Sequence, residues 1–161
     1  MDAGAALGDL ADEYGLRLKS PANSDTGGVG FLRFCRINRV GDPSHIFERG
    51  REVLRNAGST WSLGDEYWGI LEQLCIASLQ LYKTSDAEEY CAKLQTQFAG
   101  SSRVQRLVGL ILEAKGDWDA ARSVYDGLLE ANPANSLAWK RKVKSIATSL
   151  MKRMCCRCIS H

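Results

Sequence analysis

The sequence predicts an all-α protein assembled from antiparallel helix pairs that stack side by side. Three observations support this fold class. Apolar residues recur at the i, i+3, i+4 and i+7 spacing of one helix face in several consecutive segments. Gly, Pro, Asp and Ser punctuate these segments, as helix caps and stops do. The pattern also repeats every 34 residues, because the small and apolar positions around Ala121 recur one period earlier around Ala87.

Residues 1–41 are predicted to be a poorly ordered segment with a Gly-rich linker. The stretch Gly27-Gly28-Val29-Gly30 has linker composition and lacks the G-x-G-x-x-G spacing of a phosphate-binding loop. A short helix is expected around Gly8–Lys19. The helical array is expected over 42–150, and it opens with Asp42-Pro43, an N-cap followed by Pro in the first helical turn.

The first repeat unit is predicted at 68–101. Asp65 is expected to cap its first helix, and Ser85-x-x-Glu88 is a capping-box pattern that opens a second helix over 86–98. Ala87 and Leu94 are expected to pack this unit, since the 34-residue shift places them opposite Ala121 and Leu128 of the next one.

The second unit is predicted at 102–135. Ser102-x-x-Gln105 repeats the capping-box pattern, Gly116 fits the left-handed position that follows a helix, and Asn132-Pro133 ends the second helix. A third unit starts at Ser136 with a helix running toward Met151, and completing it would take a second helix to about residue 169. The residues expected to pack the second unit are Gly109, Leu112, Ala121, Tyr125, Leu128 and Pro133.

The order Gly109-x2-Leu112, Ala121-x3-Tyr125 and Pro133 resembles the tetratricopeptide repeat, a helix–turn–helix unit of 34 residues. One such unit cannot bury its apolar face alone, so neighbouring units must stack on it. The grooves between stacked helix pairs hold other proteins, and they rarely carry chemistry of their own. The resemblance therefore implies a protein-binding scaffold.

Composition agrees with a globular protein and excludes several function classes. The 161 residues are 45% apolar and 25% charged, and the net charge of +2 is too small to indicate nucleic acid as a partner. Seven cations and no acid follow Trp139, leaving 14 Lys and Arg residues against all 19 acids before it. Such a basic end suits solvent, an anionic membrane surface or an acidic partner. No secretory signal or apolar run of about 20 residues is present, which predicts a cytosolic chain whose contact with membranes is indirect.

A narrower resemblance covers about residues 65–145. It rests on the string Gly100-Ser101-x-Arg103-Val104-x-Arg106-Leu107-x-Gly109, on Lys140-Arg141-Lys142-Val143, and on Tyr67-Trp68 to Gln73. In this order and spacing they resemble the family of endoplasmic reticulum (ER) membrane protein complex subunit 2, also called tetratricopeptide repeat protein 35. The chain departs from that family at Ala99, where a Pro is usual, at Ala134, where a Thr is usual, and after Val143, where the similarity fades.

The resemblance implies a non-enzymatic scaffold that binds other subunits of the complex on the cytosolic face of the ER and supports insertion of transmembrane segments. No cofactor, metal, nucleic acid or small-molecule substrate is expected. Because family members continue through further repeats, this chain is interpreted as a C-terminally truncated form. The alternatives are a free-standing adaptor, for example one for chaperone C-termini, and a non-functional truncated isoform. The residues expected to contact partners are Arg103, Arg106, Lys140, Arg141 and Lys142.

Two other patterns carry weaker signals of chemistry. The tail 151–161 is predicted to be disordered; Cys155-x-x-Cys158 with His161 lacks the second ligand pair of a structural zinc site, and Cys158 is fourth from the end but not in a standard prenylation box. Ser44, His45 and Glu48 are interpreted as a solvated helix start, because a catalytic triad needs tertiary geometry that this spacing does not indicate. An enzyme is therefore disfavoured.

Overall fold

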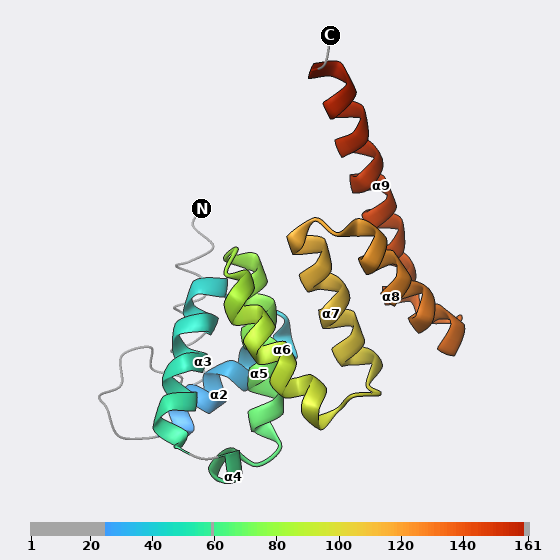
Figure 1. The fold of residues 1–161 in the computed structure, drawn as a ribbon. Helices are drawn as coiled ribbons and strands as arrows, with labels where there is room; N and C mark the ends of the chain where they lie inside the picture. The colour runs from blue at the N-terminus through green and yellow to red at the C-terminus, as the bar shows by residue number, and fades with distance from the viewer. Residues whose placement is uncertain (1–24, 59, 160–161) are drawn as a thin grey trace. The chain divides into compact units, whose positions relative to one another are not determined.

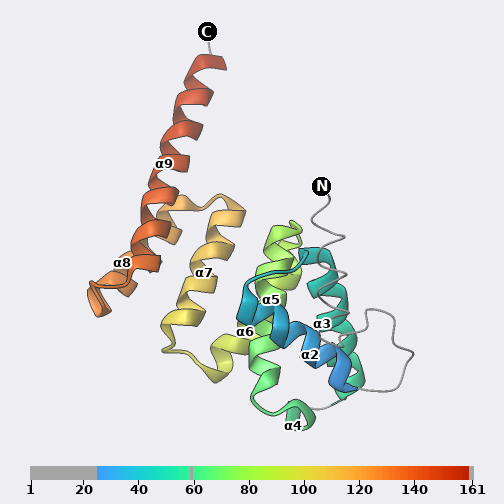
Figure 2. The same cartoon turned by 180° about the vertical axis from the view of Figure 1, so that it is seen from behind.

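The structure is a computed structural model that describes the backbone of residues 25–58 and 60–159, and the side chains of 27–58 and 62–151. Helices follow one another along the chain, and no strand occurs among the described residues (Figures 1 and 2). This confirms the predicted all-α class. The helices are α2 (Asp25–Asn38), α3 (Pro43–Ala57), α4 (Thr60–Leu63), α5 (Glu66–Gln80), α6 (Thr84–Gln97), α7 (Ser102–Lys115), α8 (Trp118–Ala131) and α9 (Ser136–Ile159).

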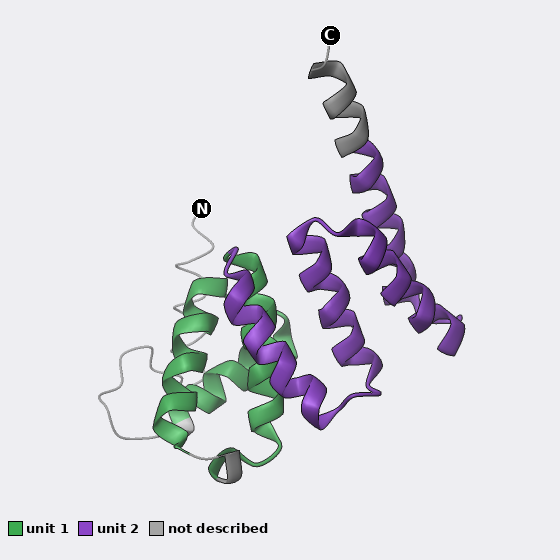
Figure 3. Cartoon of the chain, in the orientation of Figure 1, with its two compact units in different colours: residues 1–81 green, residues 82–161 purple. Residues whose placement is uncertain are grey.

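The chain divides into two compact units between Leu81 and Tyr82 (Figure 3). The first contains α2 to α5 and the second contains α6 to α9. This division differs from the single array predicted over 42–150, because it falls between the two helices of the unit predicted at 68–101. The second predicted unit, 102–135, corresponds to α7 and α8 and lies wholly within one compact unit.

The linker predicted within residues 1–41 is wrong for residues 25–38, which form α2. Phe31, Leu32 and Cys35 on this helix are buried. Gly28 lies where α2 approaches α3, since a Cβ atom at that position would come within 2.6 Å of Val53 Cγ2. The glycines were interpreted as turn formers, whereas the small size of Gly28 allows two helices to pack closely. The helix expected around Gly8–Lys19 lies outside the described residues.

Ion pairs and a hydrogen bond fasten α2 to α5. Arg36 Nη2 lies 2.7 Å from Glu66 Oε2, and Arg33 Nη2 lies 2.9 Å from Glu66 Oε1. Gln73 Nε2 also donates to the Leu32 carbonyl at 2.9 Å. The hydrogen bond from Arg36 is the main reason that the pKa of Glu66 is held below its usual value.

Glu66→Gln should therefore lower the free energy of unfolding of the first unit by about 0.5–1 kcal/mol at neutral pH, the range of a partly exposed pair. A lowered pKa in the folded state stabilises above the usual Glu pKa, and this contribution is lost as the pH falls through the folded-state value. Urea midpoints should thus differ between wild type and variant at pH 7 and converge near pH 3. Glu48→Gln, at an exposed site on α3, is the control. A gap that persists undiminished at low pH would contradict this role.

Several predicted helix ends are confirmed, and two predicted caps are wrong. Asp42 Oδ2 accepts from the His45 amide, and Gly116 ends α7 with a φ of 83°. The capping boxes at Ser85 and Ser102 do not form, because α6 starts at Thr84 and α7 is preceded by Ser101 without a side-chain cap bond.

The last helix starts at Ser136, as predicted. Its backbone continues to Ile159, so the prediction of a disordered tail over 151–161 is wrong for residues 151–159. A helix-compatible composition without Pro or Gly explains this, since Met, Lys, Arg and Leu have good helix propensity. The metal and lipid interpretations of Cys155, Cys156, Cys158 and His161 lie outside the described side chains.

Candidate protein-binding groove of the second unit

The crossing of α7 and α8 is built on one glycine and one tyrosine. Tyr125 is fully buried, and a Cβ atom at Gly109 would lie 2.5 Å from Tyr125 Cε1. Ala121, one helical turn earlier on α8, is also fully buried. Small residues at these positions let the two backbones approach while the tyrosine ring fills the space between them.

A polar network joins the three helices α7, α8 and α9. Tyr125 OH donates to Glu113 Oε1 at 2.8 Å, and Arg141 Nη1 lies 3.6 Å from Glu113 Oε2. The Glu113 side chain is only 11% exposed, so the two partners supply much of what water would otherwise provide. Burial first, and then the bond to Glu113, raise the pKa of Tyr125 far above its usual value.

Most residues expected to pack the repeats are buried. Ala121, Tyr125 and Leu128 form a cluster with Leu129 and Ala138, against which Leu112 packs while partly buried. Ala87 and Leu94 on α6 are buried as well. Pro133 is instead exposed in the turn after α8, where it ends the helix and its carbonyl accepts a hydrogen bond from Trp139 Nε1 at 3.1 Å.

The cations expected to contact partners have different surroundings. Arg141 pairs with Glu113, and Lys142 Nζ lies 2.5 Å from Asp126 Oδ1 and 5.3 Å from the centroid of the Trp139 ring. Lys140 is exposed. Consecutive helical residues are about 100° apart around the axis, so a run of three cations cannot share one face. The string alone did not reveal which of its members are engaged within the fold.

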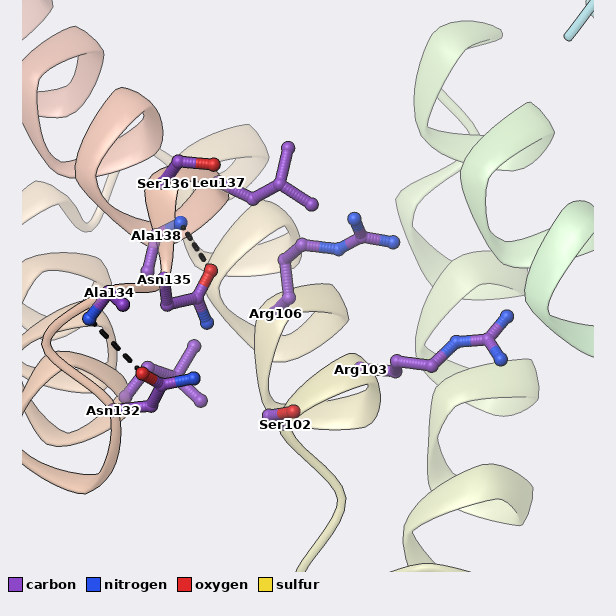
Figure 4. Close-up of a pocket in the computed structure, with 10 residues that line it drawn as sticks. Ser102, Arg103, Arg106, Asn132, Ala134, Asn135, Ser136, Leu137 and Ala138 are labelled. Atoms are coloured by element: carbon purple, nitrogen blue, oxygen red, sulfur yellow. Dashed lines mark hydrogen bonds between the residues drawn. The ribbon is translucent and has the colours of Figure 1, made fainter.

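Arg103 and Arg106 line a hollow of about 370 Å³ within the second unit (Figure 4). Figure 4 shows both guanidinium groups projecting from α7, with Leu137 reaching out from α9. The rest of the lining comes from the ends of α8 and α9 and the turn between them: Ser102, Leu128, Asn132, Ala134, Asn135, Ser136 and Ala138.

The polar lining of this groove consists mainly of hydrogen-bond donors. Asn132 Oδ1 accepts from the Ala134 amide and Asn135 Oδ1 accepts from the Ala138 amide, both at 3.1 Å. These bonds occupy the side-chain oxygens and orient the amide NH₂ groups, which can donate to a ligand. Together with the two arginines, they suit the carbonyls and carboxylates of a polypeptide. The asparagines are site residues that sequence reasoning named only as a helix stop.

Other classes of site find no support in the described part of the chain. No group of three or more His, Cys, Asp or Glu side chains lies close enough there to hold a metal ion. Within the same residues, no helix is both long and apolar enough to cross a bilayer. His45 is exposed at the start of α3, where its backbone amide takes part in the Asp42 cap.

Comparison with known proteins agrees with this architecture. A tetratricopeptide repeat profile matches residues 102–145. The chain is 40% identical over 112 residues to ER membrane protein complex subunit 2 of Xenopus tropicalis, an alignment that covers 70% of this chain and 37% of the relative. It is 30% identical over 91 residues to TPR repeat protein oca3 of Schizosaccharomyces pombe, covering 56% of this chain and 32% of that protein.

The similarity reaches further along the chain than the 65–145 expected from the motifs. A third relative, ER membrane protein complex subunit 2 of Dictyostelium discoideum, is 24% identical over 113 residues, which cover 70% of this chain and 35% of the relative. The chain thus spans little more than a third of the length of these curated relatives. Over about 70% of its own length, the chain is a tetratricopeptide-repeat homologue of ER membrane protein complex subunit 2.

Proposed function

We propose that this chain is a non-enzymatic scaffold subunit of an ER membrane protein complex. In this role it binds neighbouring subunits on the cytosolic face of the ER and supports the insertion of transmembrane proteins. The observation that carries the proposal is the 40% identity to ER membrane protein complex subunit 2 over a segment that includes the whole α7–α8 repeat. Tetratricopeptide repeats act by presenting grooves to other polypeptides.

The groove beside Arg103 supports a binding role. Its donors match polypeptide carbonyls and carboxylates, and Leu128 and Leu137 add apolar surface for side chains of the bound segment. Membrane association is proposed to be indirect, through the bound subunits. The alternative of a chaperone adaptor is distinguished by what the groove captures, because such an adaptor would bind free peptide C-termini in preference to membrane subunits.

Affinity capture of the tagged 161-residue chain from detergent-solubilised cells tests this proposal. We expect mass spectrometry to recover other subunits of the ER membrane protein complex. Arg103→Ala should reduce their recovery several-fold, as expected for a groove contact, whereas Arg55→Ala on the exposed side of α3 should leave it unchanged. Recovery of chaperones alone would contradict the scaffold role for this chain.

A further inference from the structure

The last helix presents an apolar surface that no described residue covers. Trp139, Val143, Ile146 and Leu150 follow the i, i+4, i+7, i+11 spacing of a single helix face, here called the α9 stripe. Trp139 is 48% exposed, Val143 60% and Leu150 54%. The other side of α9 faces α8 through Ala138, Ser145 and Ser149, which are buried. Several large apolar side chains on one face point to a docking surface.

The 34-residue period shows what kind of element fits this surface. α7 starts at Ser102 and α9 starts at Ser136, one period later. Gly109 and Leu112, which receive α8 on the surface of α7, correspond to Val143 and Ile146. The α9 stripe is therefore the position at which a repeat of this type accepts the second helix of its pair.

The charges beside the stripe narrow the choice of occupant. From Ser136 to Ile159 the chain has seven Lys and Arg residues and no Asp or Glu. Lys140 and Lys144 are exposed. Two copies of α9 facing each other would bring these cations together, which disfavours a second copy of the chain. An acidic helix would place opposite charges there, as Asp126 of α8 already does against Lys142.

We propose that the α9 stripe docks an amphipathic helix of another protein, with acidic residues beside its apolar face, and so completes a third helix pair in trans. A bilayer surface is the less suitable occupant, because the period equivalent to Gly109 and Leu112 specifies a helix, and because Arg141 and Lys142 are already paired with Glu113 and Asp126. The inference does not depend on membership of the ER complex, since it concerns one helix face.

The chain itself supplies a probe for this surface. Residues 117–132, which include α8, carry four acids and one arginine, and present Ala121, Tyr125 and Leu128 on one side. A fluorescein-labelled peptide of this sequence should bind the 161-residue protein with a saturating rise in anisotropy. The same peptide with Asn and Gln in place of its acids should bind several-fold more weakly, and added salt should reduce the difference.

Variants of the protein locate the binding. Val143→Glu with Leu150→Glu should weaken peptide binding by about tenfold or more, whereas Ile37→Glu, at a 70% exposed site on α2, should not. Lys140→Glu with Lys144→Glu should weaken it several-fold. All three positions on the stripe and its rim tested here are exposed, so circular dichroism should be unchanged.

Three results would overturn the proposal. The peptide may bind equally well to the stripe variant, which would indicate exchange with α8 on α7. The protein may bind vesicles containing phosphatidylserine but not the peptide, which would make the stripe a lipid-binding surface. Sedimentation may instead reveal a dimer that the stripe variant abolishes, without peptide binding. Capture of the ER complex is a separate measurement, so the failure of this inference is distinguishable from failure of the proposed function.

Discussion

Gly109→Ala should destabilise the second unit by about 1–3 kcal/mol, although alanine is the better helix former. The added methyl carbon would lie 2.5 Å from Cε1 and 2.6 Å from Cζ of Tyr125. The ring is fully buried and cannot swing into solvent, so α7 and α8 must separate or Tyr125 must adopt a strained rotamer. The measurement is the urea midpoint followed by far-ultraviolet circular dichroism.

Gly127→Ala provides a matched control within the same helix pair. Gly127 is exposed on α8, and a Cβ atom there meets nothing within 4 Å. The substitution should stabilise by about 0.5–1 kcal/mol, because alanine loses less backbone entropy on forming a helix. Opposite signs for the same substitution would show that the packing of Tyr125 determines the result at Gly109. Stabilisation by both variants would contradict the proposed crossing.

The α7–α8 pair could be predicted because its local signals agree with its tertiary packing. Gly116-Asp117 separates two segments of helical periodicity, and Asp117 Oδ1 accepts from the Ala120 amide at 3.1 Å as a helix cap should. Asn132-Pro133 ends α8 because proline cannot continue the hydrogen-bond ladder. Each of these signals depends on a few neighbouring residues, which is the range over which a single sequence is informative.

Features that depend on distant residues could not be predicted. The glycines of α2 indicate a linker until Val53 of α3 is placed against Gly28. The engagement of Lys142 depends on Asp126, which lies on the preceding helix. The donor-rich groove likewise combines Arg103 with Asn132 and Asn135, which are separate in the sequence and meet only when α7 to α9 pack together. Charge runs and glycine clusters carry no information on their partners.

Tyr125→Phe should destabilise the second unit by about 1–2 kcal/mol at pH 7, the range for a lost hydrogen bond to a charged group. The ring packing would be retained, but Glu113 would keep only Arg141, at 3.6 Å, within a site where its side chain is 11% exposed. Tyr82→Phe is the control, because the Tyr82 ring is 93% exposed. Equal urea midpoints for wild type and Tyr125→Phe at pH 7 would contradict the contribution of this bond.

The effect of Tyr125→Phe should also shrink as the solution becomes alkaline. The pKa of Tyr125 is raised in the folded state, so above the ordinary tyrosine pKa of about 10 the unfolded chain loses this proton first. Wild-type stability contributed by Tyr125 is therefore complete below that pH, and falls as the pH rises toward the folded-state value. Phenylalanine has no proton to lose. The wild-type urea midpoint should consequently approach that of Tyr125→Phe between pH 9 and pH 11 by up to about 1.4 kcal/mol per pH unit above 10, while the Tyr82→Phe protein should follow the wild type throughout.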